Sequence, residues 1–468
     1  MNVYLASFGA LLGALSMGLA LGYTAPAFLD MEKNPSNSPL DPDGVTRESQ
    51  KSLIGSILAI GALVGGFLGE PSNKILGRKY SLIAYGLPFV IGWLLLALAN
   101  NVAMLVIGRL LTGLCCGLVS GTAPTYVVEI APPSIRGLLG TCFQVMVVIG
   151  ILMAAVGGTF LSWTQLAGFC VIPAIGMSVI MFFMPETPQW LLSKDRNQEA
   201  EASLVSLRST PIVQELATMA QASANARVGG TQYSCENIKS REFYKPFFLA
   251  IGLMFFQQFS GINAVLFYQT DIFKKAAPDS DAAQSTILVC LAQVIATLVG
   301  SFLVDRLGRK VLLLLSGLGH TISLIVFGLY SHLSVSDKNF QSEYAWVALA
   351  SLIVFIVSFS LGFGPVPWMM IPELSSARVR SLVASIATAF NWTCVYIVTA
   401  SVKTLIDSVG DAGTYWLFAA ICALSCIFSM LALIETKGKS SEQIQVELLG
   451  STGVANTGQQ AEQMKTLA

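Results

Sequence analysis

The sequence predicts an all-α membrane protein in which twelve transmembrane helices form two pseudo-symmetric six-helix halves, with both termini in the cytoplasm. Three observations support this fold class. Hydrophobic residues make up 54% of the chain and charged residues only 12%, with a mean hydropathy of +0.67, whereas soluble domains carry about 25% charged residues. The apolar residues gather in long runs, and motifs in the first half of the chain return in the second. The net charge of zero argues against a nucleic-acid partner.

Twelve apolar runs are each long enough to cross a bilayer, which takes about 20 residues of helix. Six of them precede a polar segment and six follow it. They cover 6–29, 52–70, 81–99, 103–127, 138–160, 164–184, 246–270, 285–304, 311–330, 345–370, 381–402 and 413–434. The first run has no basic leader and no small-residue cleavage site, so we interpret it as a span rather than a signal peptide.

Polar segments divide the chain into four parts. We expect an N-terminal half at 1–192, a cytoplasmic linker with short amphipathic helices at 193–245, a C-terminal half at 246–436 and a partly disordered cytoplasmic tail at 437–468. An even number of spans puts both termini on one side. If that side is cytoplasmic, the inner loops and helix ends hold 20 of the 27 basic residues, with Arg109 counted among them, which fits the positive-inside rule.

Three short motifs recur in the same order at matching cytoplasmic helix ends. A Gly-Arg-Lys loop follows the second and the eighth span, a glutamate precedes an arginine by seven residues after the fourth and the tenth, and Glu-Thr ends the sixth and the twelfth. The paired positions are Gly77 and Gly308, Glu129 with Arg136 and Glu373 with Arg380, and Glu186 and Glu435. Paired six-helix halves of this kind are a transporter architecture.

Taken together, these motifs resemble the sugar porter family of the major facilitator superfamily over nearly the whole chain. The resemblance also rests on Pro185-Glu186-Thr187-Pro188, on the QQFSGIN segment at 257–263 and on Gly364-Pro365-Val366-Pro367-Trp368. The segments 22–26 and 390–393 are similar to those of insect facilitated trehalose transporters and mammalian endomembrane-type glucose transporters. The resemblance implies the major facilitator fold and a sugar substrate, either trehalose or a hexose such as glucose.

Amide side chains occur inside several spans, although an unpaired amide in the membrane costs free energy. An amide both donates and accepts hydrogen bonds, so a group of them can hold sugar hydroxyls without a charge. At positions that match the sugar-contacting residues of the family, we predict a substrate site made of Gln144, Gln257, Gln258, Asn263, Gln293, Trp368 and Asn391. The alternative is that the amides only join neighbouring helices and that Trp368 is an interfacial residue. The resemblance also implies an extracellular gate at Phe267 and Tyr268.

Charged residues are predicted to meet where the two halves approach each other at the cytoplasmic end. We expect a cytoplasmic gate made of Arg78, Glu129, Arg136, Asp305, Arg309, Glu373 and Arg380. Salt links among them would close the inner mouth while the outer mouth is open. The alternative is that these charges serve only the membrane topology, but that would not explain the repeated spacing from glutamate to arginine.

The spans contain no carboxylate placed to carry a proton. Thr24 and Ser360 stand where proton-coupled relatives carry an acid, and we interpret His320 as a structural histidine. The sequence therefore predicts facilitative uniport by rocker-switch alternating access. A proton-coupled sugar symporter and a non-transporting sugar sensor of the same fold are the alternatives.

No catalytic or metal-binding pattern stands out. The chain has two histidines, and its Gly438-Lys439-Ser440 segment lacks the first glycine of a P-loop. We therefore predict no enzymatic activity, no cofactor and no metal site. The expected partners are a small neutral sugar and the lipid bilayer, with a monomer as the functional unit. The expected location is the plasma membrane, with an endomembrane as the alternative.

Overall fold

Helices account for every regular element that the structure describes. The computed structural model describes residues 3–42, 44–132, 135–208, 212, 215–217, 219–221, 241–276, 281–376, 379–439 and 441–449. The short helix α8 (Pro188–Ser193) ends at the start of the predicted linker, and α9 (Asn197–Leu207) lies inside it. The linker residues 222–240 and the tail residues 450–468, to which the prediction of disorder applies, lie outside the described part.

The first half contains six spans. Its first span is α1 (Val3–Gly22) followed by α2 (Thr24–Lys33), with a break at Tyr23, and the short η1 (Pro35–Asn37) comes next. The other five spans are α3 (Gly44–Leu76), α4 (Arg78–Ala97), α5 (Val102–Ile130), α6 (Arg136–Phe160) and α7 (Trp163–Phe183).

The second half repeats this order with more interruptions. Its first span is α12 (Arg241–Phe259) followed by α13 (Ile262–Ala276), and they are separated at Gly261, whose φ is 88°. Then come α14 (Ala282–Leu307), α15 (Arg309–Ser336), the short α16 (Lys338–Glu343), a broken span made of α17 (Ala345–Leu361) and α18 (Val366–Leu374), α19 (Arg380–Leu431) and α20 (Ser441–Leu449).

The predicted number of twelve spans is confirmed. Eleven stretches of helix among the described residues are long and apolar enough to cross a membrane, and the longest of them, Leu382–Leu431, has 50 residues. Gly410 interrupts that stretch with a φ of 76°, so α19 contains two spans joined by a tight turn. A span takes about 20 residues, which agrees with this division.

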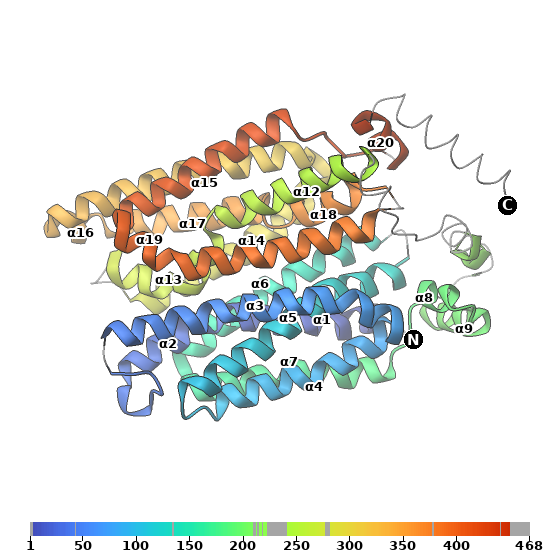
Figure 1. The fold of residues 1–468 in the computed structure, drawn as a ribbon, viewed down its shortest axis with the longest axis horizontal. Coiled ribbons are helices and arrows are strands. Elements are labelled where there is room, and N and C mark those ends of the chain that lie inside the picture. The colour runs from blue at the N-terminus through green and yellow to red at the C-terminus, as the bar shows by residue number, and fades with distance from the viewer. Residues whose placement is uncertain are drawn as a thin grey trace.

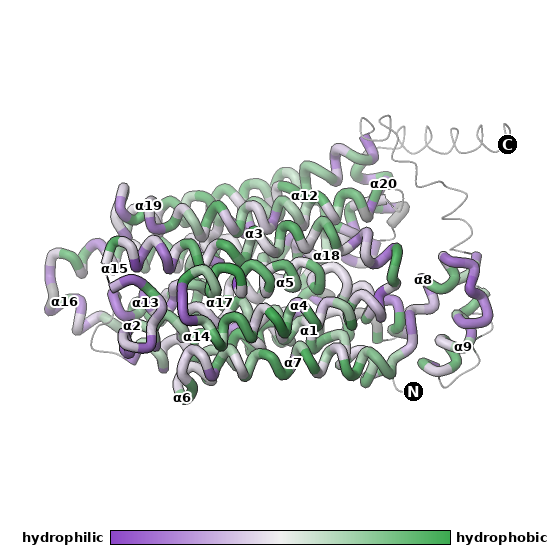
Figure 2. Tube along the Cα trace, turned by 60° about the horizontal axis from the view of Figure 1, so that its bottom comes forward, coloured by the Kyte–Doolittle hydropathy of each residue, from purple (hydrophilic) through white to green (hydrophobic). Residues whose placement is uncertain are grey.

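The two halves lie side by side as bundles, with α1–α7 in one and α12–α19 in the other (Figure 1). The helices α8, α9 and α20 lie at the same end of the molecule as the start of α1 (Figure 1). We call this the inner end, since the sequence predicts it to be cytoplasmic, and the opposite end the outer end. The helix shafts are mainly hydrophobic, and hydrophilic residues gather toward both ends and on α9 (Figure 2).

Close packing within the first half depends on glycines. The helices α3 and α5 approach at Gly61 and Gly65 on one side and at Gly113 and Gly117 on the other, and a Cβ atom at Gly65 would lie 2.0 Å from the carbonyl oxygen of Leu114. Small residues four apart allow such backbone contact between membrane helices. Between the halves, α3 packs on α19 and α6 on α14, while α2 contacts α13 at the outer end.

Candidate functional site

Gln257 lies at the centre of a buried amide network in the second half. Its Nε2 donates hydrogen bonds to the carbonyl oxygens of Phe363 and Gly364, at 2.7 and 3.2 Å, in the break between α17 and α18. These carbonyls are free to accept because the helix is interrupted there. The Gln257 Oε1 accepts a hydrogen bond of 2.8 Å from Asn391 on α19. The Gln257 side chain on α12 thus contacts both the break between α17 and α18 and the helix α19.

Gln258 and Asn263 extend this network across the break at Gly261. Gln258 donates to the Oε1 of Gln257 at 3.3 Å, and Asn263 Nδ2 donates to the Oε1 of Gln258. All four amides are at most 8% exposed. Gln257 therefore uses both of its donors and both of its acceptor sites in hydrogen bonds within the protein. Gln258 and Asn263 each keep unused donor and acceptor capacity within the described structure.

The other predicted site residues come from three further helices. Gln293 on α14 is buried, and its Oε1 has no hydrogen-bond partner among the described residues. Gln144 lies half-buried on α6, the helix that packs against α14. Trp368 lies on α18 just after the helix break and is 37% exposed. The structure thus connects Gln257, Gln258, Asn263 and Asn391 directly, but no hydrogen bond ties the remaining three to that network.

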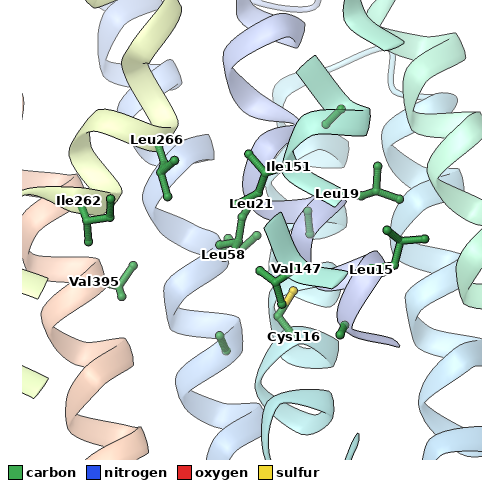
Figure 3. Close-up of a cluster of buried hydrophobic side chains, with 14 of the residues drawn as sticks. Leu15, Leu19, Leu21, Leu58, Cys116, Val147, Ile151, Ile262, Leu266 and Val395 are labelled. Carbon is green, nitrogen blue, oxygen red and sulfur yellow. The ribbon is translucent and has the colours of Figure 1, made fainter. Parts of the chain in front are cut away.

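An apolar layer from both halves lies near the amides. Ile262 and Leu266 of α13 lie in one buried cluster with Leu21, Leu58 and Ile151 of the first half (Figure 3). Apolar side chains in contact exclude water and have no donors or acceptors for a polar solute. This layer therefore lies where the two halves meet.

The predicted extracellular gate residues lie where the outer ends of the halves meet. Phe267 is fully buried, and Tyr268 lies against Gly55 of α3, where an added Cβ atom would be 3.1 Å from the tyrosine hydroxyl. An ion pair joins the halves nearby, with 2.6 Å between Lys274 Nζ and Glu32 Oε2, and Lys51 also pairs with Glu32. The outer end is therefore closed in this structure.

The ion pairs that close the outer end lower the pKa of Glu32. Burial raises the pKa of Glu32, but hydrogen bonds and charge from Lys274 and Lys51 outweigh burial, so the pKa of this carboxyl lies below its usual value. A carboxylate with a lowered pKa stabilises the closed form above its ordinary pKa, and that stabilisation is lost as the pH falls through the lowered value.

We expect acidification of the outer side below about pH 4.5, the ordinary pKa of a glutamate, to loosen the outer end. Spin labels at the exposed Asn37 and Asn339, one on each half, would report a longer distance when the end opens. In Glu32→Gln the distance should already be longer at pH 7 and respond less to pH, while the control Glu343→Gln keeps the parental response. Parental distances in Glu32→Gln at both pH values would contradict this role.

At the inner end, each resolved ion pair stays within one half. Arg78 Nη2 lies 2.9 Å from Glu129 Oε1 in the first half, and Arg309 Nη2 lies 3.1 Å from Glu373 Oε1 in the second. Arg380 donates to the carbonyl oxygens of Pro372 and Ser375. The side chains of Arg136 and Asp305 lie outside the described part. Among the gate residues whose side chains the structure describes, both of these ion pairs thus join partners in the same half.

Two glutamates that we did not place in the gate hold the inner turns. Glu186 accepts hydrogen bonds from the backbone N–H groups of Arg78 and Lys79, and Glu435 accepts those of Arg309 and Lys310, at 2.9 to 3.2 Å. These N–H groups begin α4 and α15 and have no partner inside their helix, so a carboxylate stabilises them. The repeated Glu-Thr motif was the sequence signal for this arrangement.

Arg109 is a third residue whose place the sequence analysis missed. We counted it with the inner basic residues, and that assignment is wrong: Arg109 is fully buried within the first half. Its Nη1 donates to the carbonyl oxygen of Ala20 at 2.6 Å and its Nε to that of Ile54 at 3.4 Å, so it ties α5 to the outer parts of α1 and α3. A charge inside a predicted span was the available signal.

Comparisons with known proteins agree with this architecture. Residues 5–448 match the family model described as "Sugar (and other) transporter". The chain is similar to the facilitated trehalose transporter Tret1 of Apis mellifera ligustica, with 39% identity over 95% of this chain and 88% of that one. It is also similar to Tret1 of Bombyx mori, with 38% identity over 98% and 89%.

Solved structures share the fold. The proton:xylose symporter XylE bound to 6-bromo-6-deoxy-D-glucose superposes with a TM-score of 0.79 at 24% identity, covering 96% of this chain and 99% of that one. A partially occluded inward open conformation of the xylose transporter XylE from E. coli gives 0.78 at 23% identity, covering 94% and 99%.

Proposed function

The chain belongs to the sugar transporter family, and on that premise we propose that it carries trehalose or a hexose such as glucose across a membrane by facilitated diffusion. It is a multi-pass membrane carrier rather than an enzyme. The observation that supports a neutral sugar most directly is the amide network, in which the chemistry available to a ligand is hydrogen bonding without charge. The named relatives support trehalose, and a hexose shares the same hydroxyl chemistry.

Gln258 and Asn263, with the unpaired acceptor of Gln293, are the groups proposed to contact sugar hydroxyls. Gln257 and Asn391 are proposed to position them. Trp368 and Gln144 complete the site from α18 and α6. A buried acceptor that lacks a donor costs free energy, and a bound hydroxyl would recover it.

We expect Gln258→Ala and Asn263→Ala each to weaken sugar binding by about twofold to tenfold, because a hydrogen bond to a neutral ligand contributes roughly 0.5–1.5 kcal/mol. Titration of purified protein with trehalose and with glucose measures the effect. Gln284→Ala, an exposed glutamine on α14, is the matched control and should bind like the parent. If both site variants are folded and bind both sugars normally, the proposed site is wrong.

Facilitated diffusion is supported by the side chains at the positions where a coupling acid could stand. Thr24 and Ser360 are buried hydroxyls without hydrogen-bond partners among the described residues. His320 is buried among Phe355, Phe359 and Phe363, with ring centroids 4.7 to 6.1 Å away. These aromatic rings provide no countercharge for a proton on the imidazole. Proton coupling is the second candidate, because the XylE structures with the same fold are of a proton symporter.

The deciding experiment is sugar uptake into proteoliposomes. Uptake driven by a sugar gradient alone should be unchanged by a protonophore, and an imposed pH gradient should not concentrate sugar. Accumulation against a sugar gradient would establish proton coupling instead. Counterflow of labelled sugar should be observed as well, and its absence in folded, sugar-binding protein would indicate a sensor.

Transport is proposed to follow a rocker-switch cycle in which the outer and the inner end open in turn. The closed outer end, with its pair between Glu32 and Lys274, supports one of the two states. We propose that the inner end, which carries α8, α9 and α20, faces the cytoplasm, that the four-part division at 192, 245 and 436 marks the working units, and that the carrier acts as a monomer in the plasma membrane.

A further inference from the structure

A cavity of about 440 Å³ lies beside α13 at the outer end, mainly among helices of the second half. The α13 residues that line it include Ala264, Tyr268, Asp271 and Lys275, whose spacing of four, three and four puts them on one helix face. Asn263, which bonds Gln258, does not line it. The cavity is therefore separate from the proposed sugar site, although the same short helix borders both.

The remaining walls belong mainly to α15 and α19. Phe327 of α15 and Tyr415 of α19 pack with ring centroids 4.5 Å apart, and Phe418 lies beside them. None of the seven predicted sugar-binding residues is among the lining residues. A space of this size with an aromatic wall is in the range of small-molecule sites.

Acidic groups outnumber basic ones around this cavity. Its lining includes the carboxylates of Glu48, Asp271, Asp407 and Asp411 and the ammonium groups of Lys275 and Lys403. Lys275 pairs with Asp411 at 3.3 Å, and Glu48 pairs with Lys51 at 3.1 Å. Asp271 makes no ion pair within 4 Å in the described part of the chain. Aromatic faces and an available carboxylate are the groups that bind an organic ammonium ion.

The cavity also lies where α13 would have to move. In the closed outer end, α13 contacts α2, and it follows Gly261, whose positive φ marks the break from α12. Opening the outer end requires α13 to leave α2, and the cavity lies between α13 and the walls of α15 and α19, reaching Glu48 and Ser52 of α3 at its edge. An occupant would therefore fill space beside the moving helix and would also contact the first half.

We propose that this cavity is a binding site for a small aromatic ammonium ion, and that its occupant holds α13 against the first half so that the outer end stays closed. Such a ligand inhibits transport without binding at the sugar site. Its ring packs on Phe327, Tyr415 and Phe418, and its ammonium group lies near Asp271.

The probe is the 2-phenylethylammonium ion, with uncharged 2-phenylethanol as the matched control. Titration calorimetry on purified protein should detect binding of the cation at least fivefold tighter than binding of the alcohol. In Glu32→Gln at pH 7, where the outer end is loosened without acid, the distance between labels at Asn37 and Asn339 should shorten when the cation is added. Equal binding of the two compounds would overturn the proposal. So would displacement of the cation by saturating sugar in both the parent and Gln258→Ala, together with unchanged binding of the cation in Asp271→Asn.

Two variants test the position of the site. Asp271→Asn should weaken binding of the cation about fivefold, as expected for one ion pair that is partly screened by solvent, and should leave binding of sugar unchanged. Ser331→Trp, on the α15 wall, should fill the cavity, abolish binding of the cation and slow uptake. Leu329→Trp, at a site on α15 that is 49% exposed and does not line the cavity, is the control. Parental cation binding and uptake in folded Ser331→Trp would overturn the assignment, whatever the transport mechanism proves to be.

Discussion

Gly308→Ala is expected to lose nearly all transport and to be markedly less stable than the parent. Gly308 has φ 91° and ψ 163°, a region that only glycine adopts without strain. A Cβ atom there would lie 2.7 Å from the Glu435 Oε2 atom, so the carboxylate would be pushed off the N–H groups of Arg309 and Lys310. Backbone strain of about 1–3 kcal/mol and loss of charge-assisted hydrogen bonds of about 1.5–3 kcal/mol act together.

Gly410→Ala is the matched control for this prediction. Gly410 has φ 76° and ψ 169°, but nothing lies within 4 Å of a Cβ atom there. Gly410→Ala therefore introduces backbone strain but no steric contact with another residue. Thermal unfolding of both detergent-purified variants and uptake into proteoliposomes measure the difference. Equal stability and equal uptake of the two variants would show that the Glu435 contact contributes nothing.

Glu373→Gln is expected to shift the carrier toward the form with an open inner end and to slow uptake severalfold. In the structure, Glu373 forms an ion pair with Arg309 and accepts a hydrogen bond of 2.6 Å from the Thr436 hydroxyl, and both partners lie in the second half. Rigid-body rocking preserves those bonds, so they cannot bias the cycle by themselves. We propose that Glu373 gains a basic partner from the first half when the inner ends close, so that neutralising it destabilises only that state.

The size of the shift equals the differential interaction, about 1–3 kcal/mol for conformational couplings of this kind. The labels at Asn37 and Asn339 should give the short distance in a larger fraction of Glu373→Gln molecules. Glu447→Gln, in which an exposed glutamate on α20 that pairs with Lys439 is neutralised, is the control. If Glu373→Gln keeps the parental distance distribution and uptake, the inner charges serve membrane topology and local stability rather than gating.

The span count could be predicted because hydrocarbon thickness imposes a length and a polarity on each helix. The positions of the helix breaks were harder to predict from the sequence. Gly364 and Pro365 indicated the break at 362–365 in the tenth span, whereas nothing in the hydropathy marked the bend at Tyr23 in the first. Gly410 joins the last two spans as a turn inside what is otherwise continuous helix. Apolar composition decides whether a segment enters the membrane, but not where it bends.

The candidate site was only partly readable from the sequence. Residue type pointed to Gln257 and Asn391, because amides in hydrocarbon need partners. It could not show that their partners are each other and the carbonyl oxygens of Phe363 and Gly364, since those contacts depend on how the spans pack. The same limit applies to Arg109, whose backbone partners lie on two other helices.

The saturated hydrogen bonding of Gln257 has a consequence for how sugar preference could change over generations or by engineering. A side chain with no spare donor or acceptor cannot adapt to a new epimer without loosening three helices. Gln258 and Asn263, which have spare capacity, can be exchanged at a lower cost to the fold. Substrate range should therefore diversify by substitutions at these two positions around an unchanged Gln257, and libraries that seek new sugars are best randomised there.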